Sequence, residues 1–261
     1  MNVKILFASI LISISISSQA QDGYKIVFQD EFNYKGLPDS TKWNYDVGGH
    51  GWGNQELQFY TKNRKENANV SKGYLVIEAR KEPWEVMNFT SARLTTKNKA
   101  DWKYGKVMVR AKLPKGRGTW PAIWMLATMQ NMKWPDDGEI DIMEHVGFDP
   151  GRIHASVHCK SYNHIIGTQK TKQIMLPDFS DKFHVYEVEW DQDTVKVGVD
   201  GTYYFSFSNE KKGYGEWPFD NPMHLLLNIA VGGGWGGQKG VDESIWPVKM
   251  TVDYVRVYQK N

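Results

Sequence analysis

Short runs of alternating apolar and polar residues, separated by turn-forming residues, constrain the fold of this chain more than any other feature of its sequence. The runs span residues 24–28, 74–79, 92–96, 105–113, 184–190, 194–199 and 250–258. A further run at 223–231 is continuously apolar, which is typical of a central strand buried on both faces. The pair Asp200-Gly201 predicts a tight hairpin turn after the 194–199 run. Since no stretch shows a long helical period, the pattern predicts an all-β fold, an antiparallel sandwich of two sheets.

Three irregular stretches interrupt this pattern. The longest are residues 44–69 and 232–247, and a shorter one lies at 131–137. The two longest are rich in glycine, and each of the three contains tryptophan. Because long loops in a compact domain are usually functional or mobile, we expect these stretches to form the rims of a cleft.

A segment at 138–145 places three carboxylates within six positions of a run that otherwise suits a buried strand. Side chains on a strand alternate between its faces, so Glu139 and Asp141 share one face. Strict alternation would put Glu144 on the other face, and a β-bulge at about Met143 would return it to the acidic face. Three acids on one face repel one another and raise at least one pKa. Two carboxyl groups of different protonation are what cleavage of a glycosidic bond requires.

Other interpretations of these acids remain open at this point. Alternating acids on a strand often form its solvated face, and clustered carboxylates also suit hard metal cations. The neighbouring residues favour a sugar-binding cleft, because flat apolar sugar faces stack on indole rings. Trp120, Trp124 and Trp134 precede the acidic segment, and His154 and His158 follow it. Each tryptophan taken alone is equally compatible with a core position.

The first twenty residues have the features of an export signal. Lys4 supplies a positive start, residues 5–16 form a short apolar stretch, and Ser18-Gln19-Ala20 ends it with small residues near the expected cleavage site. An uncleaved anchor is the alternative, although the stretch is short for a membrane span. We expect residues 21–261 to form one domain that is exported to the periplasm, the cell surface or the medium.

Composition limits the classes of partner and chemistry. The formal net charge is only +2 and no basic cluster stands out, so we expect neither a nucleic-acid nor a membrane partner. We also expect the protein to be a monomer. Cys159 is the one cysteine, which excludes an intrachain disulfide framework. It directly follows His158, and we interpret it as incidental rather than as a nucleophile. Eleven tryptophans and thirteen tyrosines fit carbohydrate handling, and they also fit a sandwich core.

At this point a series of segments resembles glycoside hydrolase family 16, and within it the bacterial endo-1,3-β-glucanases, or laminarinases. The segments occur in the same order as in the family and cover essentially all of residues 21–261. They are FQDEF (28–32), WGNQELQFY (52–60), TSARL (90–94), LPKG (113–116), WPAIWML (120–126), the acidic segment, LNIAVGG (227–233) and VDYVRVY (252–258).

The resemblance implies a β-jelly-roll of two stacked sheets whose concave face holds the glycan, and retention of anomeric configuration. By matching, Glu139 is the nucleophile and Glu144 is the acid/base, with Asp141 hydrogen-bonded to the nucleophile. Residues similar to those of the family's substrate cleft are Asn54, Glu56, Arg93, Trp120, Trp124, His158 and Trp235. Glu56 is equally compatible with a bracing role in its loop. No cofactor is required for the chemistry.

The resemblance also implies a structural calcium ion. Many relatives bind one on the convex side, and the matching positions here are Glu31, Gly73 and Asp253.

The function that the resemblance implies is hydrolysis of internal bonds in a 1,3-β-glucan. The alternatives are the same chemistry on mixed-linkage 1,3-1,4-β-glucan or on a β-galactan, transfer of the glycosyl group to a sugar, and a non-catalytic glucan-binding protein. The bulged Glu-x-Asp-x-x-Glu pattern is typical of laminarinases and of several galactan enzymes. A binding protein would have lost the glutamates, and both are present.

Overall fold

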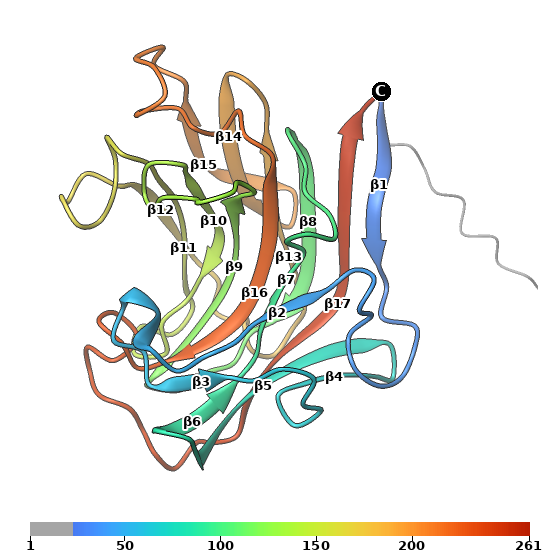
Figure 1. Ribbon diagram of the computed structural model, residues 1–261, viewed down its shortest axis with the longest axis vertical. Coiled ribbons are helices and arrows are strands. Elements are labelled where there is room, and N and C mark those ends of the chain that lie inside the picture. The colour runs from blue at the N-terminus through green and yellow to red at the C-terminus, as the bar shows by residue number, and fades with distance from the viewer. Residues whose placement is uncertain (1–22) are drawn as a thin grey trace, which may run out of the picture.

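A computed structural model describes residues 23–261, so the predicted export signal lies outside the described residues. The strands gather in two layers (Figure 1). The first is a seven-stranded sheet in the order β12-β11-β10-β9-β16-β7-β2. Its strands are β2 (Asn44–Asp46), β7 (Arg93–Thr95), β9 (Thr119–Ala127), β10 (Glu139–Glu144), β11 (Arg152–His158), β12 (Lys170–Met175) and β16 (Met223–Val231). Within the described range, no helix has the length and apolar character needed to cross a bilayer.

The second is a ten-stranded sheet that follows the path β15-β14-β13-β8-β17-β5-β6-β3, with β1 paired to β17 and β4 paired to β5. Its strands are β1 (Tyr24–Asp30), β3 (Gln58–Tyr60), β4 (Ala68–Ser71), β5 (Tyr74–Trp84), β6 (Met87–Ser91), β8 (Gly105–Lys112), β13 (His184–Trp190), β14 (Thr194–Val199), β15 (Thr202–Ser208) and β17 (Val248–Lys260). A short 3-10 helix, η1 (Gly51–Gly53), precedes β3. The prediction of an all-β sandwich is confirmed.

The hydrophobic core fills the space between the layers. Along β8, Val107, Val109 and Ala111 are fully or almost fully buried while the residues between them are half-exposed, as expected for a strand with one face on the core. Every residue of β16 is buried, which confirms the prediction of a central strand covered on both faces. The turn between β14 and β15 is also as predicted, since Asp200 and Gly201 both have positive φ and link Val199 to its partner Thr202.

The prediction that residues 44–69 are irregular throughout is partly wrong. This stretch contains β2, β3 and β4, which are three or four residues long. Three or four residues are too few for a clear alternation, and Asn44 and Asn69 are poor β-formers, so the sequence alone gives little strand signal there. These strands form because distant segments pair with them: β2 pairs with β7, β3 with β6 and β4 with β5.

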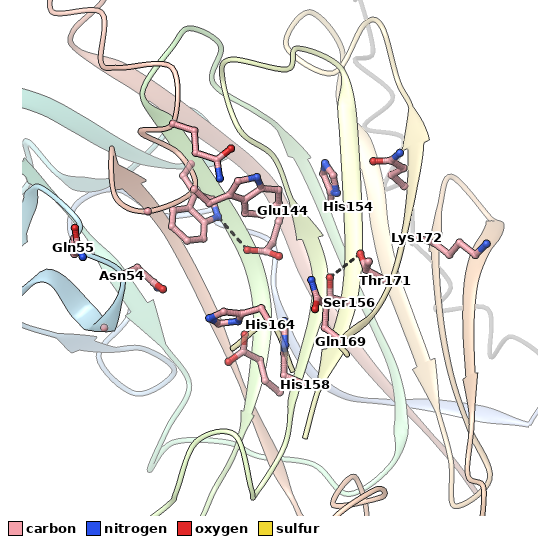
Figure 2. A pocket seen from close by; sticks show the side chains of 17 residues that line it. Asn54, Gln55, Glu144, His154, Ser156, His158, His164, Gln169, Thr171 and Lys172 are labelled. Carbon is pink, nitrogen blue, oxygen red and sulfur yellow. Dashed lines mark hydrogen bonds between the residues drawn. The ribbon is translucent and has the colours of Figure 1, made fainter. Parts of the chain in front are cut away.

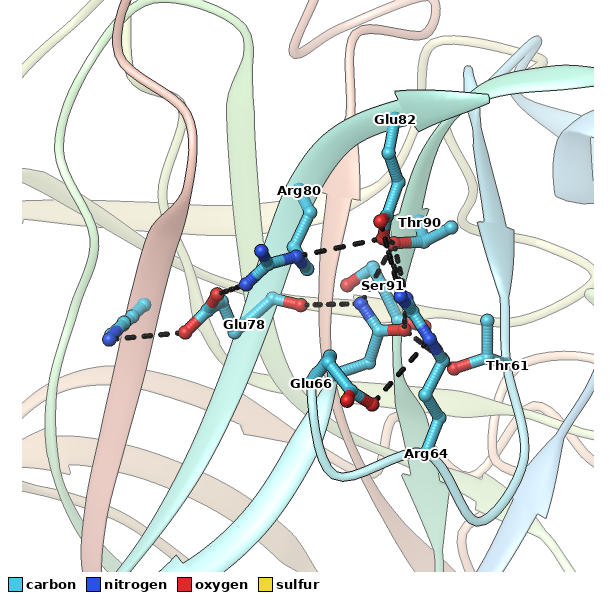
Figure 3. A network of polar contacts seen from close by, with 10 residues as sticks. Thr61, Arg64, Glu66, Glu78, Arg80, Glu82, Thr90 and Ser91 are labelled. Carbon is cyan, nitrogen blue, oxygen red and sulfur yellow. Dashed lines mark hydrogen bonds and ion pairs between the residues drawn. The ribbon is translucent and has the colours of Figure 1, made fainter. Parts of the chain in front are cut away.

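A polar network fixes the loop that leads into β4 (Figure 3). The guanidinium of Arg64 donates to Glu82 at 2.6 and 3.1 Å and to the side-chain oxygen of Asn67 at 2.7 Å. Asn67 in turn donates to Thr90 at 2.9 Å, and Thr90 bonds Glu82. The network joins this loop to β5 and β6, so the edge of the larger sheet beside the cleft loops is held by side chains as well as by backbone pairing.

Candidate active site

The acidic strand β10 contains the predicted bulge. Its pairing with β9 joins Asp141 to Trp124 and Met143 to Ile123, so Ile142 is an extra residue of β10 without a partner on β9. Ile142 and Met143 are both fully buried. Two consecutive side chains therefore point into the core, and Glu144 returns to the face that carries Glu139 and Asp141. The predicted bulge is confirmed.

The neighbouring strand β11 places polar side chains opposite these acids. His158 pairs with Glu139, Ser156 with Asp141 and His154 with Glu144. The next strand continues two of these rows, since Thr171 and Gln173 pair with Ser156 and His154. The result is a polar floor built from β10, β11 and β12, and the hydroxyl of Ser156 donates to Thr171 at 3.1 Å (Figure 2).

A cleft of about 1020 Å³ lies over this floor. Its lining residues come from β9 to β12, from two of the predicted rim loops and from the loop between β11 and β12. They are Gly53, Asn54, Gln55, Trp120, Glu139, Glu144, His154, Ser156, His158, His164, Gln169, Thr171, Lys172, Gln173, Gly234, Trp235 and Gln238. Figure 2 shows Asn54 and Gln55 on one side of Glu144, and Ser156, Thr171 and Lys172 on the other.

Indole groups hold the two glutamates. Trp134 donates its indole N–H to Oε2 of Glu139 at 2.7 Å, and Trp120 donates to Oε1 of Glu144 at 3.0 Å. Nε2 of His158 lies 3.3 Å from Oδ2 of Asp141. One ligand-type atom each of Glu139, Asp141 and His158 lies within 4.8 Å of the others. The three carboxyl groups and their nitrogen partners therefore form one compact cluster.

Burial raises the pKa of every carboxyl group in the cluster. For Glu139 burial is the main cause and the charge of Asp141 adds to it, raising the pKa to about 8. Burial and then the charge of Glu139 raise the pKa of Glu144 to about 7. Asp141 is only 2% exposed, and burial followed by the charge of Glu144 holds its pKa well above the ordinary value. Since both glutamates keep an edge open to the cleft, water offsets part of the effect for them. The cluster therefore retains protons near neutral pH.

Trp235, on the loop after β16, forms an aromatic wall with Trp120. The rings of Trp120 and Trp235 meet edge to face with centroids 5.5 Å apart, and Trp235 meets His154 in the same way at 4.9 Å. The loops carrying these groups are joined by backbone bonds, including one from Gly234 N–H to Asn54 O at 2.7 Å. Four predicted substrate residues, Asn54, Trp120, His158 and Trp235, thus line the cleft that holds the acidic cluster.

Arg93 and Trp124 form a neighbouring group that does not line this cleft. The Arg93 guanidinium lies 4.6 Å from the ring of Trp124 and 4.7 Å from that of Trp52, and it pairs with Asp46 at 2.9 Å. The indole of Trp124 donates to Asn228 at 2.7 Å. Contact with the two rings fixes the guanidinium on the β7 side of the sheet, where β9 and β16 separate β7 from the acidic strand β10.

Glu56 supports the loops that line the cleft through hydrogen bonds of its carboxylate. It is 7% exposed and does not line the cleft. Its carboxylate accepts hydrogen bonds from Asn54 at 3.2 Å, Gln58 at 2.6 Å and Tyr60 at 3.3 Å. The other end of Gln58 accepts the backbone N–H of Val231 at 2.7 Å, at the start of the second rim loop. Of the two roles that the sequence left open for Glu56, the structure places it in the bracing one.

The sequence did not single out several residues of the site. Ser156, Thr171 and Gln173 follow the two-residue alternation of their strands, which is the signal that could have identified them. The sequence identifies Trp134 only as an aromatic neighbour of the acidic segment. Its bond to Glu139 depends on the path of a loop, which the sequence does not reveal.

Cys159 is buried in the core, and burial raises the pKa of its thiol. Both observations fit its interpretation as incidental.

The residues predicted for calcium lie near one another at backbone level. Asp30 pairs with Val255 and Leu75 with Val252, which brings the positions next to Glu31, Gly73 and Asp253 to one region of β17. The carboxylates, however, bind arginines: Glu31 accepts from Arg256 at 2.7 and 2.9 Å, and Asp253 accepts from Arg110. As oriented, they do not fit a cation, because a metal would have to displace both guanidinium groups. The calcium site stays a prediction, and we assign no step of the reaction to a metal.

Comparison with known proteins places this geometry in a family. The model of Glycosyl hydrolases family 16 matches residues 55–256. The "Beta-glucanase" of Rhodothermus marinus is 55% identical over 244 residues, which cover 90% of this chain and 85% of the relative. The X-ray structure of the laminarinase from the same organism superposes with a TM-score of 0.90 at 54% identity, covering 91% of this chain and 98% of that one. A mutant of SCLam, described as a non-specific endo-β-1,3(4)-glucanase and co-crystallised with 1,3-β-D-cellotriosyl-glucose, gives 0.88 at 50% identity, with 91% and 95% covered. The chain therefore belongs to glycoside hydrolase family 16 and has the jelly-roll sandwich of its laminarinase relatives.

Proposed function

We propose that this chain hydrolyses internal β-1,3 bonds of a laminarin-type β-glucan with retention of anomeric configuration. The observation that carries the proposal is the compact cluster of three carboxyl groups on the bulged strand β10, placed in a cleft with a tryptophan wall. A cleft of about 1020 Å³ that runs from β9 to β12 has room for several sugar rings, which suits attack within a chain.

The proton distribution in the cluster supports distinct roles for the two glutamates. The carboxyl groups of Glu139 and Asp141 are neighbours, with one oxygen of each within 4.8 Å of the other, and Asp141 is the more deeply buried of the two. A proton on Asp141 avoids a fully buried charge, and it removes the Asp141 charge that contributes to raising the pKa of Glu139 to about 8. Glu139 is then the carboxylate, and it accepts the hydrogen bond from Trp134. Glu144, whose pKa burial raises to about 7, keeps its own proton below neutral pH. Glu139 is then suited to attack and Glu144 to donate a proton.

The reaction follows in two displacements. Glu144 gives its proton to the leaving glycosidic oxygen while a carboxylate oxygen of Glu139 bonds to the anomeric carbon, and the carbon–oxygen bond to the leaving chain breaks. The resulting glycosyl ester is attacked by water, whose proton passes to the Glu144 carboxylate, and Glu139 departs as a carboxylate. Two inversions at one carbon give net retention.

A second substrate, mixed-linkage 1,3-1,4-β-glucan, is favoured by the 50% identity to a non-specific endo-β-1,3(4)-glucanase. Purified protein incubated with laminarin, mixed-linkage glucan, agarose and carrageenan, beside the Glu139→Gln variant, separates the candidates. We expect 1,3-linked oligosaccharides from laminarin, and none from the variant. Cleavage of a galactan alone would overturn the substrate, and binding of glucan without cleavage of any polymer would overturn the enzyme.

We further propose that the protein is exported and acts as a monomer. Export rests on the sequence of residues 1–20 alone. N-terminal sequencing of the protein recovered from its source should begin at about residue 21, and a chain that still begins at Met1 in the cytoplasm would contradict export. Light scattering of the purified protein should give the mass of one chain.

A further inference from the structure

Each of the two glutamates accepts one indole N–H, and the two indoles come from different elements. Trp134 lies in the loop before β10 and donates to Glu139 at 2.7 Å, while Trp120 lies on β9 and donates to Glu144 at 3.0 Å. An indole N–H only donates, so each bond strengthens when its acceptor is ionised. The first step of the proposed reaction needs Glu139 ionised and Glu144 protonated, so the two indoles donate to groups in opposite protonation states.

We propose that Trp134 and Trp120 are positioning residues with separate tasks: Trp134 holds Glu139 as the attacking carboxylate, and Trp120 stabilises Glu144 after it has released its proton. The inference rests on the roles given to the glutamates under the proposed function. It extends them by assigning the electrostatic control of each glutamate to one named indole.

The first task follows from the crowding around Glu139. Burial favours the neutral form of Glu139, and any ionisation of Asp141 would add to this effect, whereas the bond from Trp134 favours the ionised form. Trp134 is fixed by contacts on its other side, because its ring lies 5.0 Å from that of His164 and 6.0 Å from that of His158. The indole N–H is therefore held in place before substrate binds, and no reorganisation is required at the moment of attack.

The second task belongs to the hydrolytic half of the reaction. After the first displacement Glu144 is a carboxylate that must wait for water, and Trp120 is its one side-chain hydrogen-bond donor in the described part of the chain. Trp120 is itself held by the edge of Trp235 at 5.5 Å. The same bond makes protonation of Glu144 less favourable before the first displacement. Trp120 therefore assists the second displacement and opposes the first.

Other titratable groups also face this cluster, and the variants Trp134→Phe and Trp120→Phe both retain them. They are Asp141 on β10, His154 and His158 on β11, His164 in the following loop, Lys172 on β12 and Tyr204 on β15. No titratable side chain belongs to β9. Because these groups are unchanged in either variant, a difference between the two variants reports on the two indole bonds.

The test is the pH dependence of kcat/KM for laminarin oligosaccharides in Trp134→Phe and Trp120→Phe, which keep an aromatic ring and lose the donor. The acidic limb reports ionisation of Glu139 and the basic limb that of Glu144. We expect Trp134→Phe to move the acidic limb upward by about 0.5–1 pH unit with the basic limb in place, and Trp120→Phe to move the basic limb upward by a similar amount. Trp84→Phe, which loses an exposed indole at the end of β5 outside the cleft, is the matched control and should leave both limbs in place.

Equal movement of both limbs in the two variants, or lower activity without movement of either limb, would overturn the proposal. A measurement on the wild-type protein needs neither substrate nor an active variant. The indole ¹H–¹⁵N resonance of Trp134 should titrate with the acidic limb and that of Trp120 with the basic limb. Resonances that do not change across these pH ranges would refute the tasks even if laminarin is cleaved, whereas a failure of the proposed function would appear as no cleavage by wild type.

Discussion

Glu56 offers a sharp test of how the cleft is held together. Its carboxylate is 7% exposed and accepts hydrogen bonds from Gln58 and Tyr60, which are both fully buried, and from Asn54 at the cleft edge. The Glu56→Ala variant leaves two buried donors without their acceptor. Glu56→Gln is the matched control, because its amide oxygen still accepts from Gln58 and Tyr60, and Asn54 can rotate its amide to face the new NH₂ group.

The expected magnitudes follow from this count. A buried donor without an acceptor costs about 1–3 kcal/mol, so two of them cost roughly 2–6 kcal/mol, and the cavity adds to this unless water enters it. We expect Glu56→Ala to lower the free energy of unfolding by about 4 kcal/mol and Glu56→Gln by less than about 1 kcal/mol.

Urea unfolding at pH 7 and KM for laminarin measure both consequences. KM should rise in Glu56→Ala, because Asn54 loses its support and the backbone of Asn54 holds Gly234 at 2.7 Å, next to the cleft residue Trp235. Glu56→Gln should keep a KM close to that of wild type. The reasoning would be refuted if Glu56→Ala lost less than about 1 kcal/mol and bound laminarin as tightly as wild type.

Three further predictions concern the acids, the packing of the loops and the arginine beside the cleft. Burial raises the pKa of Glu144 from 4.5 to about 7, so the folded state binds its proton more tightly than the unfolded state and wild type loses stability as pH rises through this range. Glu144→Gln lacks this loss and should be more stable than wild type by about 1–3 kcal/mol at pH 8, with no difference at pH 4, in thermal unfolding. Gly147→Ala would place a methyl group 1.7 Å from a backbone oxygen and should cost at least about 3 kcal/mol in urea unfolding, whereas Gly215→Ala, whose nearest neighbour is 3.6 Å away, should stay within about 1 kcal/mol of wild type. Arg93→Lys loses the planar group stacked between two tryptophan rings and should raise KM for laminarin about tenfold, and an unchanged KM would place Arg93 outside substrate binding.

The parts of the fold and site that could be predicted depend on local pattern. Alternation along β13 and β14 and the continuous apolar run of β16 defined these strands with their observed bounds, and Asp200-Gly201 defined the hairpin between β14 and β15. The bulge in β10 followed from the cost of placing Glu144 among buried isoleucines. In each case a few adjacent residues carry enough physical information to decide the structure.

The parts that could not be predicted depend on contacts between distant segments. The short strands β2 and β3 exist because of their partners β7 and β6, which lie far away in the sequence. The bond from Trp134 to Glu139 requires the folded path of the intervening loop. Glu56 lies within the resemblance to family 16, and only its three hydrogen-bond donors, two of them buried, distinguish bracing from substrate contact. Register and loop path are properties of the whole sandwich, so no local pattern reveals them.

The anomeric configuration of the first product tests the central claim most directly. Laminarin oligosaccharides are mixed with the enzyme in an NMR tube, and the anomeric proton of the new reducing end is recorded before mutarotation. A double displacement through Glu139 predicts that the β-anomer appears first, and that Glu139→Gln produces no signal over the same time. First appearance of the α-anomer would mean that water attacks the sugar directly, and it would contradict the role of Glu139 as the nucleophile.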